Sequence, residues 1–113
     1  MGQQFAGEWV LGDQGRILRY GFENKDKTAF DLTGATLIKL RARPLDGEPK
    51  PVIERSGTIF GAATNGEADF EDLTNGATIP QGDRRLYEAE IQFTKSSKLY
   101  FMPRFQYAVV RPI

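Results

Sequence analysis

The 113-residue sequence contains no cysteine and no histidine. Without cysteine the chain has no disulfide, no thiolate nucleophile and no Cys-ligated zinc or iron–sulfur site. Without histidine it lacks the most common general base and the most common soft metal ligand. Carboxylates are then the only plausible acid and base groups, and nothing in the sequence selects a catalytic pair among them. We therefore expect a non-enzymatic protein with no cofactor and no metal.

The sequence also lacks an excess of charge of either sign, because fifteen Lys and Arg balance fifteen Asp and Glu. A formal charge of zero gives no overall field that would attract nucleic acid or an anionic bilayer. No apolar run approaches the roughly 20 residues of a membrane span, and residues 1–5 lack the basic and apolar regions of a secretory signal. We expect a soluble, cytoplasmically made protein whose partners are proteins or sugars, not nucleic acid or membrane.

What the sequence does contain is a series of short segments separated by turn signals such as Asn65-Gly66 and Asn75-Gly76. Residues 16–22, 36–43 and 86–94 alternate between apolar and polar side chains, the period of two that is typical of half-buried strands. In the second of these segments, Ile38 and Leu40 would face the core. Further strands are predicted over residues 8–11, 51–55, 58–62, 68–71 and 105–109.

The alternating segments predict seven or eight short strands, and no window has the apolar 3.6-residue repeat of a helix. We therefore expect a single domain over residues 1–113, an immunoglobulin-like antiparallel β-sandwich, with a small barrel as the alternative. Its core would rely on aromatic residues, of which there are eight Phe, four Tyr and one Trp. The sequence does not say whether the tryptophan, Trp9, is buried.

Two sets of residues are candidates for contact with a partner. Lys39, Arg41 and Arg43 would form a basic row on the outward face of a strand. This row could bind an acidic protein partner, since Arg makes bidentate contacts to carboxylates, or it could be a solvated face paired with acids such as Glu88 and Glu90. We favour the solvated face. The functional alternative is a protein interface, because nucleic-acid binding would normally need a net positive domain with exposed aromatics.

The second set lies in the stretch from Leu99 to Tyr107, which is apolar on both faces. Such a strand is either central to the sandwich or covered on its outer side by another subunit. Pro103 cannot donate to a ladder, so it marks an edge, a bulge or a change of partner strand. The candidate contact residues here are Tyr100, Phe101, Met102 and Arg104.

Two other features have a functional and a structural interpretation. Aromatic residues such as Tyr20 and Tyr100 could stack on sugar rings, although in a small β domain such rings are more often core or subunit contacts. Asp69, Glu71 and Asp72 could supply oxygen ligands to calcium, but their spacing fits no EF-hand loop, so a solvated turn is the favoured interpretation.

The order of several motifs resembles a known family. These motifs are Gly12-Asp13, Phe30-Asp31-Leu32-Thr33-Gly34-Ala35-Thr36-Leu37, Pro44-Leu45-Asp46-Gly47, Gly66-Glu67-Ala68-Asp69-Phe70 and Pro80-Gln81-Gly82, the last leading into Leu86-Tyr87-Glu88-Ala89-Glu90-Ile91. They resemble the immunoglobulin-like domain of tailed-bacteriophage structural proteins, of the kind found at the N-terminus of phage baseplate upper proteins. The resemblance covers nearly the whole chain. Arg84-Arg85 departs from it by lengthening the late turn, and the baseplate proteins continue into further domains.

The resemblance implies a non-enzymatic structural or assembly component of a phage or prophage virion, located in the tail, baseplate, head–tail junction or capsid surface. The partners would be other phage structural proteins, including copies of the chain in a homo-oligomer. The protein would be made in the bacterial host cytoplasm and reside in the virion, and the family supplies no catalytic residues to transfer. The alternative function is a carbohydrate-binding or adhesin-like module, and a small hydrolase is the weakest candidate.

Overall fold

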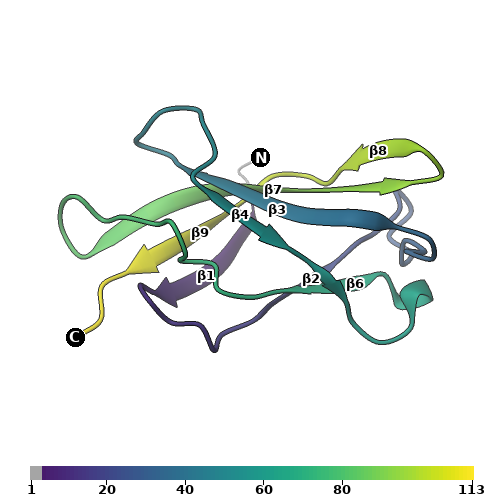
Figure 1. The fold of residues 1–113 in the computed structure, drawn as a ribbon, viewed down its shortest axis with the longest axis horizontal. Coiled ribbons are helices and arrows are strands. Elements are labelled where there is room, and N and C mark those ends of the chain that lie inside the picture. Colours follow the sequence, from purple (N-terminus) through teal and green to yellow (C-terminus); the bar gives the residue numbers. More distant parts are fainter. Residues whose placement is uncertain (1–3) are drawn as a thin grey trace.

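The computed structural model describes residues 4–113, which form two β-sheets that pack face to face (Figure 1). The larger, six-stranded sheet has the order β1-β9-β7-β3-β4, and β8 also pairs with β7. Its strands are β1 (Gln4–Val10), β3 (Thr36–Pro44), β4 (Ile53–Ser56), β7 (Arg84–Lys95), β8 (Lys98–Phe101) and β9 (Phe105–Val110). The smaller sheet has the order β2-β6-β5, with β2 (Leu18–Gly21), β5 (Thr58–Ile59) and β6 (Glu67–Phe70). A short 3-10 helix, η1 (Ala63–Asn65), precedes β6.

This strand order confirms the β-sandwich and matches the immunoglobulin arrangement, in which strands B, E and D face strands C, F and G. Two details differ from the expectation. The larger sheet is mixed, because β1 runs parallel to β9 while the other paired strands are antiparallel. Residues 4–113 contain nine strands, since the apolar stretch near the C-terminus divides into β8 and β9 around Pro103.

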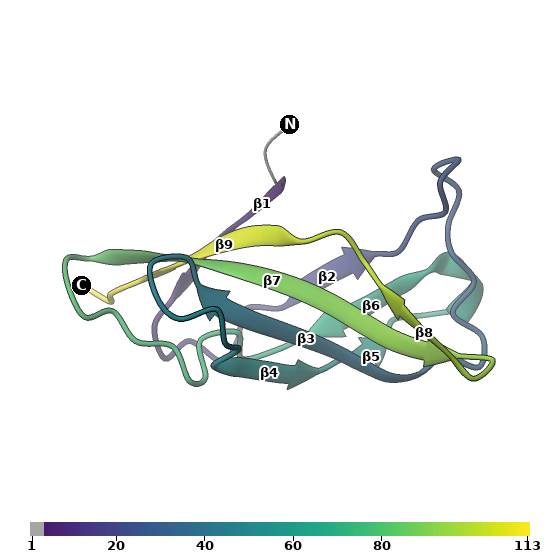
Figure 2. The same ribbon diagram turned by 90° about the horizontal axis from the view of Figure 1, so that it is seen from above.

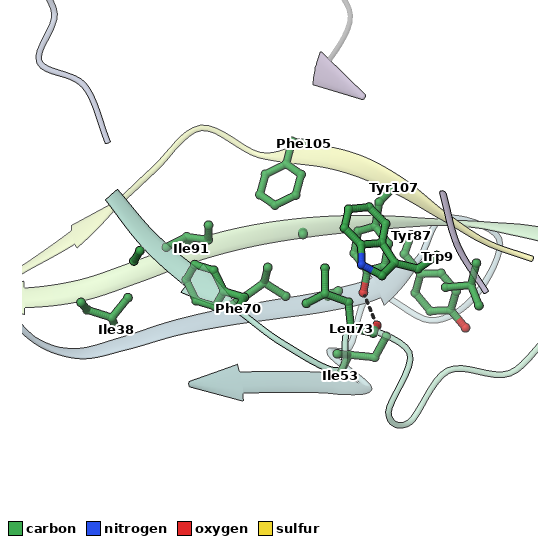
Figure 3. Close-up of a cluster of buried hydrophobic side chains, with 14 of the residues drawn as sticks. Trp9, Ile38, Ile53, Phe70, Leu73, Tyr87, Ile91, Phe105 and Tyr107 are labelled. Carbon is green, nitrogen blue, oxygen red and sulfur yellow. Dashed lines mark hydrogen bonds between the residues drawn. The ribbon is translucent and has the colours of Figure 1, made fainter. Parts of the chain in front are cut away.

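The core is built from the faces that the alternation predicts. On β7 the inward residues are Tyr87, Ala89, Ile91 and Phe93, and all four are buried. The same holds for Ile38, Leu40 and Ala42 on β3. Trp9 is also buried and lies beside Tyr107, with the two rings edge to face and their centroids 5.5 Å apart (Figure 3).

Aromatic contacts connect the two sheets in a core that contains no disulfide. Phe22, directly after β2, meets Phe93 of β7 edge to face at 5.4 Å. At the start of β7, the Tyr87 hydroxyl donates a hydrogen bond to the backbone oxygen of Thr78 and accepts one from its amide, at 2.8 and 2.9 Å. This is the tyrosine corner of immunoglobulin-like folds, and Ala89 stands two residues later, where antibody domains have their second cysteine.

The chain crosses from the larger sheet to the smaller one at Gly57, between β4 and β5. A Cβ atom at this position would lie 2.7 Å from the Phe70 ring and 2.8 Å from the Ile38 side chain. Glycine therefore lets the backbone pass directly over the core. Within the part of the chain that the structure describes, no helix is long and apolar enough to cross a membrane.

Candidate functional site

The strand β8 lies at an edge of the larger sheet. Both β8 and β9 pair with the same side of β7, and Pro103 lies in the irregular link between them. The strand β9 is covered on its other side by β1, whereas β8 pairs with β7 alone among the strands of residues 4–113. The apolar stretch therefore contains one central strand and one edge strand (Figure 2).

The open edge of β8 presents backbone groups from two residues. The amide of Met102 donates to the Ile91 carbonyl oxygen at 2.8 Å, so Met102 faces β7. In an antiparallel pair, alternate residues direct their N–H and C=O groups to the same neighbour. The backbone of Tyr100 therefore also faces β7, while the N–H and C=O groups of Leu99 and Phe101 point away from it. Their side chains are 55% and 53% exposed, respectively.

A groove of about 1250 Å³ runs between this edge of the larger sheet and β2 of the smaller one. Its lining includes all four candidate residues of the C-terminal stretch, namely Tyr100, Phe101, Met102 and Arg104, together with Leu18, Tyr20, Phe30 and Phe105. The groove thus brings the predicted contact residues together with others that the sequence did not single out.

Aromatic rings line much of this groove and hold one another in place. The Tyr100 ring stacks on buried Phe93 at 5.1 Å and meets Phe30 edge to face at 5.6 Å. On the other wall, Tyr20 stacks on Phe105 at 5.7 Å. Burial, and to a lesser extent the charge of Glu23, raises the pKa of the Tyr20 phenol, so this residue stays neutral at physiological pH.

The basic row lies elsewhere, on the outer face of the larger sheet. The Lys39 ammonium is 3.3 Å from a Glu54 carboxylate oxygen, and the Arg43 guanidinium is 2.8 Å from Glu88. Arg41 lies between two acidic residues in the strand register, Glu54 on β4 and Glu90 on β7. This arrangement is the solvated, cross-strand paired face that the sequence favours for the row.

Arg104 connects the outer face to the groove. Its guanidinium lies 3.3 Å from both Glu88 and Glu90. The hydrogen bond to Glu90 is the main cause that raises the pKa of Arg104. Although Arg104 lines the groove, its charge is matched by these two carboxylates.

Two lysines on the groove lining are not matched in this way. Lys25 and Lys27 belong to the turn between β2 and β3, and neither forms an ion pair with any residue between 4 and 113. The turn is held by its own polar side chains. The Asn24 amide donates to the Thr28 hydroxyl at 3.0 Å, and the Asp26 carboxylate accepts from the same hydroxyl at 2.6 Å, which lowers the pKa of Asp26.

The acidic cluster at the end of β6 is occupied by arginines. Asp69 accepts two hydrogen bonds from the Arg19 guanidinium, at 2.8 and 3.0 Å, and the bond from Arg19 lowers the pKa of Asp69. Asp72 lies 3.9 Å from the guanidinium of Arg55. Across residues 4–113, no group of three or more acidic side chains is arranged to hold a metal ion.

A smaller hollow of about 670 Å³ lies at a distance from the groove, between the turn after β3 and the segment that enters β7. It contains Arg84 and Arg85, which were expected to lengthen the late turn but form the first two residues of β7, in register with Val110 and Val109. The guanidinium of Arg85 binds Asp46 at 2.7 Å, and that of Arg84 binds Glu8 at 3.1 Å. These two ion pairs therefore connect β7 to the turn after β3 and to β1.

The sequence could not identify the second wall of the groove. Tyr20 could be assigned to an inward face from alternation, but its position opposite Tyr100 depends on which strands form the edges of the two sheets. Phe30, Lys25 and Lys27 lie in or next to a turn, where no periodicity exists to orient them. Of the surface features described above, the groove is the best candidate for a binding site.

In comparisons with known proteins, no protein-family model and no curated protein matches this chain.

Proposed function

We propose that this domain is a non-enzymatic structural or assembly component of a phage or prophage virion, in the tail, baseplate, head–tail junction or capsid surface. Its partners are other phage structural proteins, including copies of itself. The domain contributes a stiff β-sandwich with one adhesive surface, and symmetric repetition multiplies weak contacts at that surface into a stable assembly.

The observation that carries this proposal is the groove beside β8. Its lining contains Tyr100, Phe101, Met102 and Arg104, and exposed apolar groups next to an unpaired strand edge are typical of a surface that another chain covers. The outer face of the larger sheet is a weaker candidate, because Lys39 and Arg43 already have carboxylate partners. The virion setting rests on the resemblance of the sequence motifs to phage immunoglobulin-like domains.

The proposal is tested by measuring the solution mass of the chain by light scattering over a series of concentrations. We expect a defined oligomer that the substitution Phe101→Lys dissociates, because a charge would have to be buried at the contact. Val52→Lys is the matched control, since Val52 is 50% exposed and precedes β4 at the opposite edge of the sheet. Equal loss of mass in both variants would refute a specific contact at β8.

The aromatic lining of the groove favours one alternative, a carbohydrate-binding or adhesin-like module. Tyr20 and Tyr100 come from different sheets and line the groove together with the polar side chains of Asn24 and Gln4, a combination that suits a sugar ring and its hydroxyl groups. A glycan array separates the two functions. Saturable sugar binding by a chain that stays monomeric would replace the assembly role with this alternative.

A further inference from the structure

We propose that the groove binds one extended segment of a neighbouring protein chain, which adds to the open edge of β8 as a further strand. This inference rests on the proposed assembly role and specifies its partner. The segment carries apolar side chains at alternate positions and carboxylates that reach the lysines of the groove. The main chain supplies the pairing, and the side chains supply selectivity.

The first argument is that no charged side chain stands at the outward backbone positions of β8. Native proteins protect exposed edges with charges, bulges or very short strands. The edge strand β1 shifts register next to Gly7, β4 carries Glu54, β2 carries Arg19, and β5 is only two residues long. On β8, the two residues whose backbone groups point outward are Leu99 and Phe101, which are apolar and exposed.

The second argument concerns the space available. Figure 2 shows that the turn between β2 and β3 projects past the open edge of β8, on the side of the smaller sheet. A folded domain that approached this edge would meet the turn, whereas a single extended strand needs only the width of the groove between them. The groove volume of about 1250 Å³ exceeds the 300–1000 Å³ that is typical of small-molecule pockets. A peptide segment therefore fits the dimensions better than a compact ligand or a folded surface.

The third argument is charge complementarity. Lys98 is not among the groove-lining residues, but it lies two residues before Tyr100 on the same face of β8. Together with Lys25 and Lys27 it gives three cations for which the described part of the chain provides no ion-pair partner. The acidic residue on the groove lining is Glu23. A segment with carboxylates would be attracted to these lysines, and its affinity would fall with increasing salt, which screens the attraction.

The test uses the full chain and the synthetic peptide acetyl-Glu-Val-Glu-Val-Glu-Val-Glu-amide, with amide hydrogen exchange followed by NMR. In the free protein we expect the Leu99 and Phe101 amides to exchange faster than the Tyr100 amide, because only the latter faces β7. At a peptide concentration ten times Kd, exchange at Leu99 and Phe101 should slow by about tenfold. A peptide of the same sequence with all its backbone nitrogens methylated should not protect them, because neither of its edges can then donate to β8.

Two pairs of variants separate backbone pairing from other contacts. Phe101→Pro removes the outward N–H, whereas Phe101→Ala removes the ring and keeps the donor, so we expect Pro to abolish binding and Ala only to weaken it. The double substitution Lys25→Glu and Lys27→Glu should weaken binding of the Glu peptide and strengthen binding of the corresponding Lys peptide. Cooperative unfolding of each variant, measured alongside, confirms that it is folded.

The outcomes distinguish this inference from the assembly role. Strand addition is overturned if neither the Glu peptide nor the Lys peptide slows exchange at the Leu99 and Phe101 amides. It is also overturned if the methylated peptide slows exchange as much as the unmethylated one. If the wild-type chain still forms an oligomer that Phe101→Lys dissociates, the assembly role stands without it. A monomeric chain that binds sugars in the groove and no peptide overturns both.

Discussion

The hydroxyl of Tyr87 should contribute more to stability than the hydroxyl of Tyr100, and the substitution Tyr87→Phe tests this. The ring is fully buried, and its hydroxyl bonds both the amide and the carbonyl oxygen of Thr78. The carbonyl oxygen keeps a second donor, the Arg85 guanidinium at 3.2 Å, but the part-buried amide loses the partner that the hydroxyl provides. One lost hydrogen bond and one unsatisfied donor together predict a decrease in the free energy of unfolding of about 2–3 kcal/mol.

The measurement is urea denaturation followed by the fluorescence of Trp9, which is buried beside Tyr107 and reports the packing of the core. The midpoint should fall with an unchanged m-value, since the two proteins expose the same surface on unfolding. Tyr100→Phe is the matched control, because the Tyr100 ring packs on Phe93 and its exposure leaves the hydroxyl to water. We expect this control to lie within about 0.5 kcal/mol of wild type. If Tyr87→Phe is equally mild, the hydroxyl does not fasten the segment before β7 and the reasoning is wrong.

Three further predictions follow from local geometry. Gly66 and Gly82 both have a positive φ, of 68° and 72°, but a Cβ at Gly66 would lie 2.6 Å from a backbone oxygen whereas one at Gly82 would meet open space. Gly82→Ala should therefore lower the free energy of unfolding, measured in thermal melts, by roughly 1 kcal/mol, and Gly66→Ala should lower it by clearly more. Tyr100→Ser should lower the melting temperature because its ring packs on the core, while Phe101→Ser should leave the melting temperature nearly unchanged and reduce assembly. The pKa of Asp69 is lowered in the folded state, so its contribution is present above the unfolded pKa of about 3.9 and is lost as pH falls through the folded value. Acid titrations of wild type and Asp69→Asn should therefore converge below about pH 4, and a constant difference would contradict the assignment.

Alternation predicted the orientation of side chains better than the pairing of strands. The inward positions on β3 and β7 could be assigned because side chains alternate between faces with a period of two whatever the neighbouring strand is. The parallel pairing of β1 with β9 could not be assigned in this way. It joins Trp9 to the register position of Val109, 100 residues later in the numbering, and no local pattern encodes such a contact.

The same distinction explains what the sequence revealed about the groove. The excess of apolar residues around Tyr100 and Phe101 indicated an unusual strand, because a strand with one wet face should not be apolar on both sides. Tyr100 faces the core because it lies opposite buried Phe93 in the register with β7, whereas Phe101 lies opposite Gln92 and is exposed. Pro103 lies in the link after β8, which is an edge strand paired with β7. The opposite wall, including Tyr20 and Phe30, comes from the other sheet and required the topology.

Net charge, by contrast, is a poor guide to the electrostatics of this surface. A formal charge of zero excludes a strong overall field, but it does not make each face neutral. The outer face of the larger sheet comes close to local neutrality, since Arg43 and Arg104 share Glu88, at 2.8 and 3.3 Å. Beside β8, by contrast, Lys25, Lys27 and Lys98 have no ion-pair partner among residues 4–113. A partner would therefore be selected by a local asymmetry of a few charges within one Debye length of the groove, a feature that the overall composition averages away.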